Sequence, residues 1–145
     1  MKIAIVCRGD DNSKNVASKL LSKLKKEKAE LDDISPQVVI FVGGDGTFLR
    51  AVNQYLDNIN EISFIGIHTG TLGFFCDFSL DELDEVVRLV LEEKPYKKHY
   101  RLLEACLTTD IDHRHFYAVN EIRIENAQHT IISDVYIDDV FFENI

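Results

Sequence analysis

Three glycines around a single aspartate form the part of the sequence best suited to chemistry. The segment is Gly43-Gly44-Asp45-Gly46-Thr47, and it directly follows the apolar run 38–42. Glycines let the backbone turn sharply and leave peptide N–H groups open, and a helix that begins there adds partial positive charge. Such a loop can cradle phosphate, whereas a carboxylate inside it repels phosphate unless it holds a metal or takes up a proton. The pattern predicts a phosphate-binding turn with Asp45 as general base; the structural alternative is a tight strand-to-helix turn capped by Asp45.

The loop differs from two common phosphate-binding motifs. No Gly-Lys-Ser/Thr follows it, so it is not a P-loop, and Leu49 and Arg50 stand where the dinucleotide fingerprint would place a third glycine. Arg50 falls about one helical turn after the loop. Its side chain therefore either reaches a phosphate or lies on an exposed helix face.

Alternating strands and helices must position this loop. Apolar runs at 2–7, 38–42 and 63–67 predict buried parallel strands. Between and after them, apolar residues recur at helical spacing, with start signals at 11–13, the glycine loop and a capping box at 79–82, and Pro95 ends the last helix. The fold class is α/β, with a parallel-sheet domain over residues 1–96 that carries the Gly-Gly-Asp-Gly loop.

The pattern changes after this domain. Alternating stretches at 100–102, 105–107 and 122–124 are separated by polar turns at 110–114 and 126–129, which predicts antiparallel strands. Residues 97–145 therefore form the beginning of an all-β second domain. The sequence stops inside the apolar stretch 140–145, so we expect a truncated domain and a fragment of a longer protein.

Composition limits the classes of partner and compartment. With 16 Lys and Arg against 25 Asp and Glu, the formal net charge is −9, which argues against nucleic acid or an anionic membrane as partner. No apolar run reaches the ~18 residues of a membrane span, and no signal peptide is recognisable, so a cytoplasmic location is predicted. The cysteines Cys7, Cys76 and Cys106 fit neither a disulfide framework nor a zinc site, and we expect reduced core residues.

Three motifs in order resemble those of bacterial NAD kinases. They are the glycine loop 43–47, the segment Gly66-Ile67-His68-Thr69-Gly70-Thr71-Leu72-Gly73-Phe74, and Ala118-Val119-Asn120-Glu121. Gly-Gly-Asp-Gly alone is shared with diacylglycerol and sphingosine kinases and, loosely, with phosphofructokinases. The Leu-Gly-Phe and Asn-Glu elements point to the NAD kinase branch, and the resemblance covers nearly the whole chain.

The resemblance implies phosphorylation of the 2′-hydroxyl of the adenosine ribose of NAD to give NADP. ATP or, in some members, polyphosphate would be the donor, with a divalent cation, expected to be Mg²⁺. Asp45 would accept the hydroxyl proton, in a reaction that depends mostly on positioning and charge stabilisation. The residues that would bind substrate or nucleotide are Gly44, Gly46, Leu49, Leu72, Phe74, Asn120 and Glu121.

Each of these residues also has an ordinary structural explanation. Phe74 lies in an apolar cluster, which is typical of a core residue, and Asn120-Glu121 fits a solvated strand face. Thr69 and Thr71 either donate hydrogen bonds to a ligand or cap a turn. His113 and His115 lack further ligands nearby in the sequence, so no metal site is predicted from the protein's own residues.

Two further alternatives concern the whole chain. It could be a lipid or other small-molecule kinase of the same superfamily, although it has no basic amphipathic segment. It could also be a truncated, non-catalytic nucleotide-binding module, because family members continue with a second glycine-bearing loop and a Thr/Ser-rich stretch that are absent here. The resemblance also implies a homo-oligomer, commonly a homotetramer.

Overall fold

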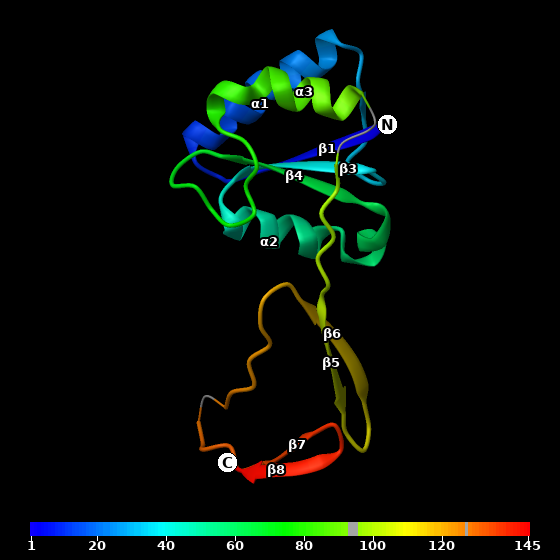
Figure 1. The fold of residues 1–145 in the computed structure, drawn as a ribbon, viewed down its shortest axis with the longest axis vertical. Helices are drawn as coiled ribbons and strands as arrows, with labels where there is room; N and C mark the ends of the chain where they lie inside the picture. Colours follow the sequence, from blue (N-terminus) through cyan, green and yellow to red (C-terminus); the bar gives the residue numbers. More distant parts are fainter. Residues whose placement is uncertain (93–95, 127) are drawn as a thin grey trace. The chain divides into compact units, whose positions relative to one another are not determined.

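The computed structural model describes residues 1–92, 96–126 and 128–145. The chain divides into two compact units, Met1–Lys98 and His99–Ile145. Figure 1 traces both units along the chain. The domain boundary predicted at residue 96 lies two residues before this division.

A parallel four-stranded sheet forms the centre of the first unit, as predicted. Its strands are β1 (Lys2–Cys7), β2 (Glu30–Leu31), β3 (Val38–Gly43) and β4 (Ser63–His68), in the order β2-β1-β3-β4. All three pairings are parallel. The two-residue strand β2 was not predicted, because so short and exposed an edge strand carries no apolar pattern.

Helices cover both faces of this sheet. The helices α1 (Asp11–Lys26) and α3 (Leu83–Leu91) lie on one face, and α2 (Asp45–Gln54) lies on the other (Figure 1). Short 3₁₀ turns, η1 (Leu56–Glu61) and η2 (Leu80–Glu82), complete the unit. The predicted capping box is confirmed, since the Ser79 N–H donates to Glu82 Oε2 at 2.7 Å. The predicted helix end at Pro95 lies outside the described residues.

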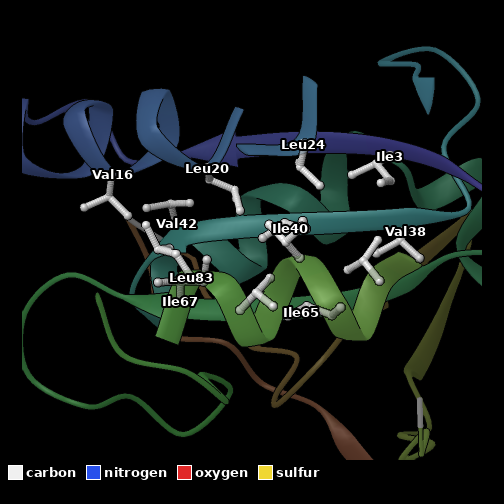
Figure 2. Packing of buried hydrophobic residues seen from close by; sticks show 13 residues of the cluster. Ile3, Val16, Leu20, Leu24, Val38, Ile40, Val42, Ile65, Ile67 and Leu83 are labelled. Carbon is white, nitrogen blue, oxygen red and sulfur yellow. The ribbon is translucent and has the colours of Figure 1, made fainter. Parts of the chain in front are cut away.

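Aliphatic side chains fill the layer between the sheet and the helices α1 and α3. Figure 2 shows Leu20 and Leu24 of α1 together with Ile40 and Val42 of β3 in this layer. Every residue of β3 is buried, which explains its uninterrupted apolar sequence. This core fixes the carboxyl end of β3, where the glycine loop begins.

The second unit consists of two antiparallel hairpins. One pairs β5 (Leu103–Thr108) with β6 (His113–Ala118), and the other pairs β7 (Asp134–Ile137) with β8 (Val140–Asn144). The predicted antiparallel class is confirmed. The strands predicted at 100–102 and 122–124 are wrong, because alternation forms a strand only where another strand pairs with it, and none of the described strands does.

The cysteines only partly match the prediction. All three are free, as expected; Cys7 and Cys76 are partly buried. Cys106 is exposed, so its prediction as a core residue is wrong, because β5 is almost entirely exposed. None of the described helices has the length and apolar character needed to cross a bilayer.

Candidate active site

The glycine loop lies at the carboxyl edge of the parallel sheet. Gly43 ends β3, and Gly44 is the N-cap of α2. Gly43 has φ +156°, and a Cβ there would lie 2.2 Å from Thr47 Oγ1, so the turn requires glycine. The strand register sets Gly43 beside His68, the last residue of β4. The ends of two neighbouring strands therefore meet at this loop, which is where open parallel sheets bind ligands.

The two other glycines of the loop leave open space. A Cβ at Gly44 or Gly46 would meet no atom within 4 Å. The Thr47 N–H donates to the Gly44 carbonyl at 2.8 Å, and helix geometry leaves the N–H groups of Asp45 and Gly46 before it without a partner inside the helix. This end of α2 carries the positive end of the helix dipole. This end of α2 can therefore accept an anion close to the backbone.

Asp45 is held by the loop that follows β4. Its Oδ2 accepts a hydrogen bond from the Phe74 N–H at 3.0 Å, and its Oδ1 accepts one from the Phe75 N–H at 3.1 Å. Each carboxylate oxygen keeps a second lone pair for a substrate. A Cβ on Gly73 would lie 2.3 Å from Asp45 Oδ1, so glycine is required for this close approach.

Hydrogen bonds attach both ends of the 69–78 loop to neighbouring elements of the first unit. At its start, the buried Thr69 hydroxyl hydrogen-bonds to the Ser13 hydroxyl at 2.7 Å, and the Asn12 side-chain amide donates to the Thr69 carbonyl at 3.0 Å. At its end, the Phe78 N–H donates to the Gly66 carbonyl at 2.9 Å. Thr69 therefore has a structural role that joins the loop to α1.

The apolar residues of this region separate into exposed and packed groups. Phe74 is 78% exposed, Leu72 is 66% exposed and Leu49 is 36% exposed. The structural explanation of Phe74 as a core residue is therefore wrong. Its neighbour Phe75 takes the packing role, with its ring stacked on Phe48 at a centroid distance of 4.4 Å. Three apolar side chains from the predicted ligand set thus remain accessible to solvent.

Asn120 and Glu121 lie in the second unit, after β6. Both are exposed, and Glu121 Oε1 lies 3.6 Å from Arg123 Nη2. The structure brings Asp45 together with the backbone of the 72–75 segment. Asn120 and Glu121 belong to the other unit, His99–Ile145.

Two arginines lie at the same sheet edge, and one of them is paired with an aspartate. The backbone N–H of Arg8 donates to the Val42 carbonyl at 2.8 Å, and the side-chain Nε of Arg8 pairs with Asp10 Oδ2 at 2.6 Å. Arg50 donates from Nη2 to the Cys7 carbonyl. The Arg8 guanidinium, followed by the Ser13 N–H, holds the pKa of Asp10 well below its usual range. Sequence analysis missed Arg8, although its place directly after a predicted strand marked it as an edge residue.

Cys76 lies beside the glycine loop. Its Sγ lies 3.7 Å from the Gly43 carbonyl oxygen. Burial, followed by the charge of Asp45, raises the pKa of this thiol. A protonated thiol is a poor nucleophile, so Cys76 is not a candidate nucleophile of this site.

A separate groove runs beside β1 and α1. It has a volume of about 470 Å³ and is lined by side chains that include Ile5, Leu21 and Leu31. None of the predicted nucleotide-binding residues lines it. The candidate site is therefore the sheet edge at the glycine loop.

Comparison with known proteins gives the family. Residues 6–95 match the ATP-NAD kinase N-terminal domain. The chain is 37% identical over 145 residues to NAD kinase 1 of Listeria monocytogenes serovar 1/2a, covering 99% of this chain and 55% of that protein. It is 40% identical over 146 residues to the NAD kinase of Latilactobacillus sakei subsp. sakei, covering 99% and 54%.

The fold agrees with a solved structure. Yeast NADH kinase complexed with NADH matches with a TM-score of 0.80 at 16% identity, over 99% of this chain and 54% of that one. The chain spans about half the length of the curated relatives it matches. On the family match and these identities, the chain belongs to the NAD kinase family.

Proposed function

We propose that this chain is the N-terminal part of an NAD kinase that phosphorylates the 2′-hydroxyl of the adenosine ribose of NAD, giving NADP. The observation that carries the proposal is the Asp45 carboxylate, held by the Phe74 and Phe75 N–H groups beside an open glycine loop. Family membership favours this function over a lipid or other small-molecule kinase.

Asp45 acts as the general base in this proposal. It accepts the proton of the ribose hydroxyl while the hydroxyl oxygen forms a bond to the terminal phosphorus of the donor. The bond between that phosphorus and the leaving phosphate oxygen breaks, which releases ADP when ATP is the donor. The two backbone hydrogen bonds fix the direction of the carboxylate, so the base is positioned before substrate binds.

The open backbone at Gly44 and Gly46 binds phosphate in the same scheme. The N-terminus of α2 and the guanidinium group of Arg50 stabilise the charge that spreads over the phosphoryl oxygens. Leu49, Leu72 and Phe74 contact the dinucleotide through their exposed apolar surface. Asn120 and Glu121 hydrogen-bond the dinucleotide, a role that rests on family resemblance.

A divalent cation, expected to be Mg²⁺, neutralises phosphate charge when bound. Among the described residues, Asp45 does not belong to any group of three or more metal-ligating side chains close enough to share an ion. This fits Mg²⁺ that arrives with the donor phosphates, because Mg²⁺ usually keeps its waters and few protein ligands. ATP or polyphosphate as donor and a homotetramer complete the proposal by family resemblance, and the cytoplasmic location is proposed from the sequence.

Asp45→Asn in the full-length enzyme tests the proposal. The amide keeps the size of the side chain but cannot take up the proton, so turnover should fall by about 10²- to 10⁴-fold. NAD affinity, from titration calorimetry, and melting temperature should change little. Asp57→Asn is the matched control, because Asp57 is exposed and follows the far end of α2. Unchanged turnover in Asp45→Asn would refute the role of Asp45, and NAD binding without any turnover in the parent enzyme would favour the binding-module alternative.

A further inference from the structure

The β5–β6 hairpin separates its side chains into an apolar and a polar face. Cross-strand partners share a face, and the register pairs Cys106 with His115 and Thr108 with His113. The apolar face carries Leu103, Ala105, Leu107, Phe116 and Ala118, with Arg114 as its one charged member; the opposite face carries Glu104, Cys106, Thr108, His113, His115 and Tyr117. The cysteine and both histidines therefore lie on the polar face of the hairpin, opposite the apolar side chains.

The side chains of Cys106, His113 and His115 converge on this face. One ligand atom from each lies within 4.8 Å of the others. Cys106 Sγ is 3.3 Å from His113 Nε2, and the two imidazole rings are 5.0 Å apart. Ligands bonded to a tetrahedral zinc ion at about 2.0 to 2.3 Å stand roughly 3.3 to 3.6 Å from one another. Small side-chain movements would thus bring all three onto one ion.

Neighbouring side chains hold both rings in an orientation suited to metal binding. His115 Nδ1 lies 2.8 Å from Glu104 Oε1, and His113 Nδ1 lies 3.0 Å from Thr108 Oγ1. The Tyr117 hydroxyl donates to the same Glu104 oxygen at 3.0 Å. With Nδ1 occupied, each ring presents Nε2, and a carboxylate behind a histidine is the usual support of a zinc ligand.

We propose that Cys106, His113 and His115 form a zinc site on the polar face of the β5–β6 hairpin. One thiolate and two imidazoles are the donor set that Zn²⁺ prefers, and three protein ligands leave a fourth position for water. Binding releases the Cys106 thiol proton to solvent. The bound ion would link β5 to β6. None of its three ligands belongs to the residues proposed for the kinase reaction, so this proposal does not depend on the proposed function.

Cobalt spectroscopy on the 145-residue chain, kept reduced by a phosphine, tests the site. Co²⁺ should bind one equivalent and give a thiolate charge-transfer band in the near ultraviolet together with tetrahedral bands in the visible range. Zn²⁺ should displace it, and competition then gives the Zn²⁺ affinity. Zn²⁺ should also slow amide hydrogen exchange in β5 and β6.

Variants identify the ligands. Cys106→Ser should abolish the charge-transfer band, and His113→Asn or His115→Asn should weaken binding at least 100-fold. Glu104→Gln should weaken it about 10- to 100-fold, the usual effect of losing a carboxylate behind a histidine ligand. Cys7→Ser and His129→Asn are matched controls outside the cluster and should keep the full spectrum. Absence of the band in the parent chain, or equal affinity in Cys106→Ser, would overturn the proposal.

Discussion

The two units of the chain differ most in how much they bury. Every side chain that is buried among the described residues belongs to Met1–Lys98, where helices cover both faces of the sheet. In His99–Ile145 the strands are paired by hydrogen bonds, yet even Phe116, Phe141 and Phe142 remain about half exposed. Backbone pairing alone therefore does not make a core, and an isolated two-stranded hairpin is at best marginally stable in water.

The two units also differ in their glycine content. All seven glycines of the chain lie at or before residue 73, and three of them, Gly43, Gly66 and Gly73, have neighbours that leave no room for a Cβ. The first unit thus contains several close backbone approaches that one added carbon would disturb. Substitutions should consequently have large effects in the first unit and small ones in the second.

Core truncation should give the largest contrast between the units. Leu20 in α1 is fully buried, so Leu20→Ala should lower the free energy of unfolding by about 2 to 5 kcal/mol. Phe142→Ala, at an exposed position in β8, should change it by less than about 0.5 kcal/mol. Urea unfolding followed by circular dichroism at 222 nm reports the helices, and those that the structure describes lie in the first unit. Equal effects of Leu20→Ala and Phe142→Ala would contradict the expected contrast between a buried and an exposed position.

A single added carbon near Asp45 should give the next largest effect. In Gly73→Ala the Cβ would approach Asp45 Oδ1, so the carboxylate must move, and under the proposed mechanism turnover of the full-length enzyme should fall by about 10²-fold. Gly70→Ala is the control from the same loop, because a Cβ there meets nothing within 4 Å. Similar turnover in the two variants would contradict the role of this contact.

Exposed aromatics should behave differently from packed ones within the first unit. Phe74→Ala should weaken NAD binding about tenfold, as expected from loss of one aromatic contact, and leave the melting temperature unchanged. Phe75→Ala removes the ring stacked on Phe48 and should lower the melting temperature. Titration calorimetry with NAD and thermal unfolding separate the two effects. A lower melting temperature with intact NAD affinity in Phe74→Ala would favour a structural role instead.

The smallest effect concerns pH and the edge of the first sheet. The hydrogen bond from Lys2, followed by those from the Ser35 and Ile34 N–H groups, lowers the pKa of Asp32 to about 2 from its usual 3.8. Because the folded state binds this proton more weakly than the unfolded state, the stabilisation is complete above about pH 4 and is lost as pH falls through about 2. Asp32→Asn should therefore destabilise slightly at pH 7 and have a clearly smaller effect at pH 2, as measured by urea unfolding. An equal destabilisation at both pH values would contradict the assignment.

Much of the fold could be predicted because local patterns and tertiary structure agree in the first unit. The apolar runs became β1, β3 and β4, and the glycine loop ended β3 as expected. In the second unit, alternation at 122–124 suggested a strand that the structure lacks, since pairing depends on a partner that periodicity cannot reveal.

The site was predictable only in part. Asp45 was identified from its glycine neighbours, but its hydrogen bonds to the Phe74 and Phe75 N–H groups connect residues about 30 positions apart. Exposure of Phe74 could not be inferred from an apolar cluster. Cys106 lies seven positions before His113, and only the hairpin register brings them together.

The fastened 69–78 loop has a consequence for the energetics of ligand binding. Hydrogen bonds hold it at Thr69, at Phe74 and Phe75, and at Phe78. A free loop loses about 1 to 2 kcal/mol of conformational entropy per residue when a ligand orders its backbone. Here that ordering accompanies folding, so a ligand that touches the exposed Phe74 ring keeps most of its contact energy as affinity.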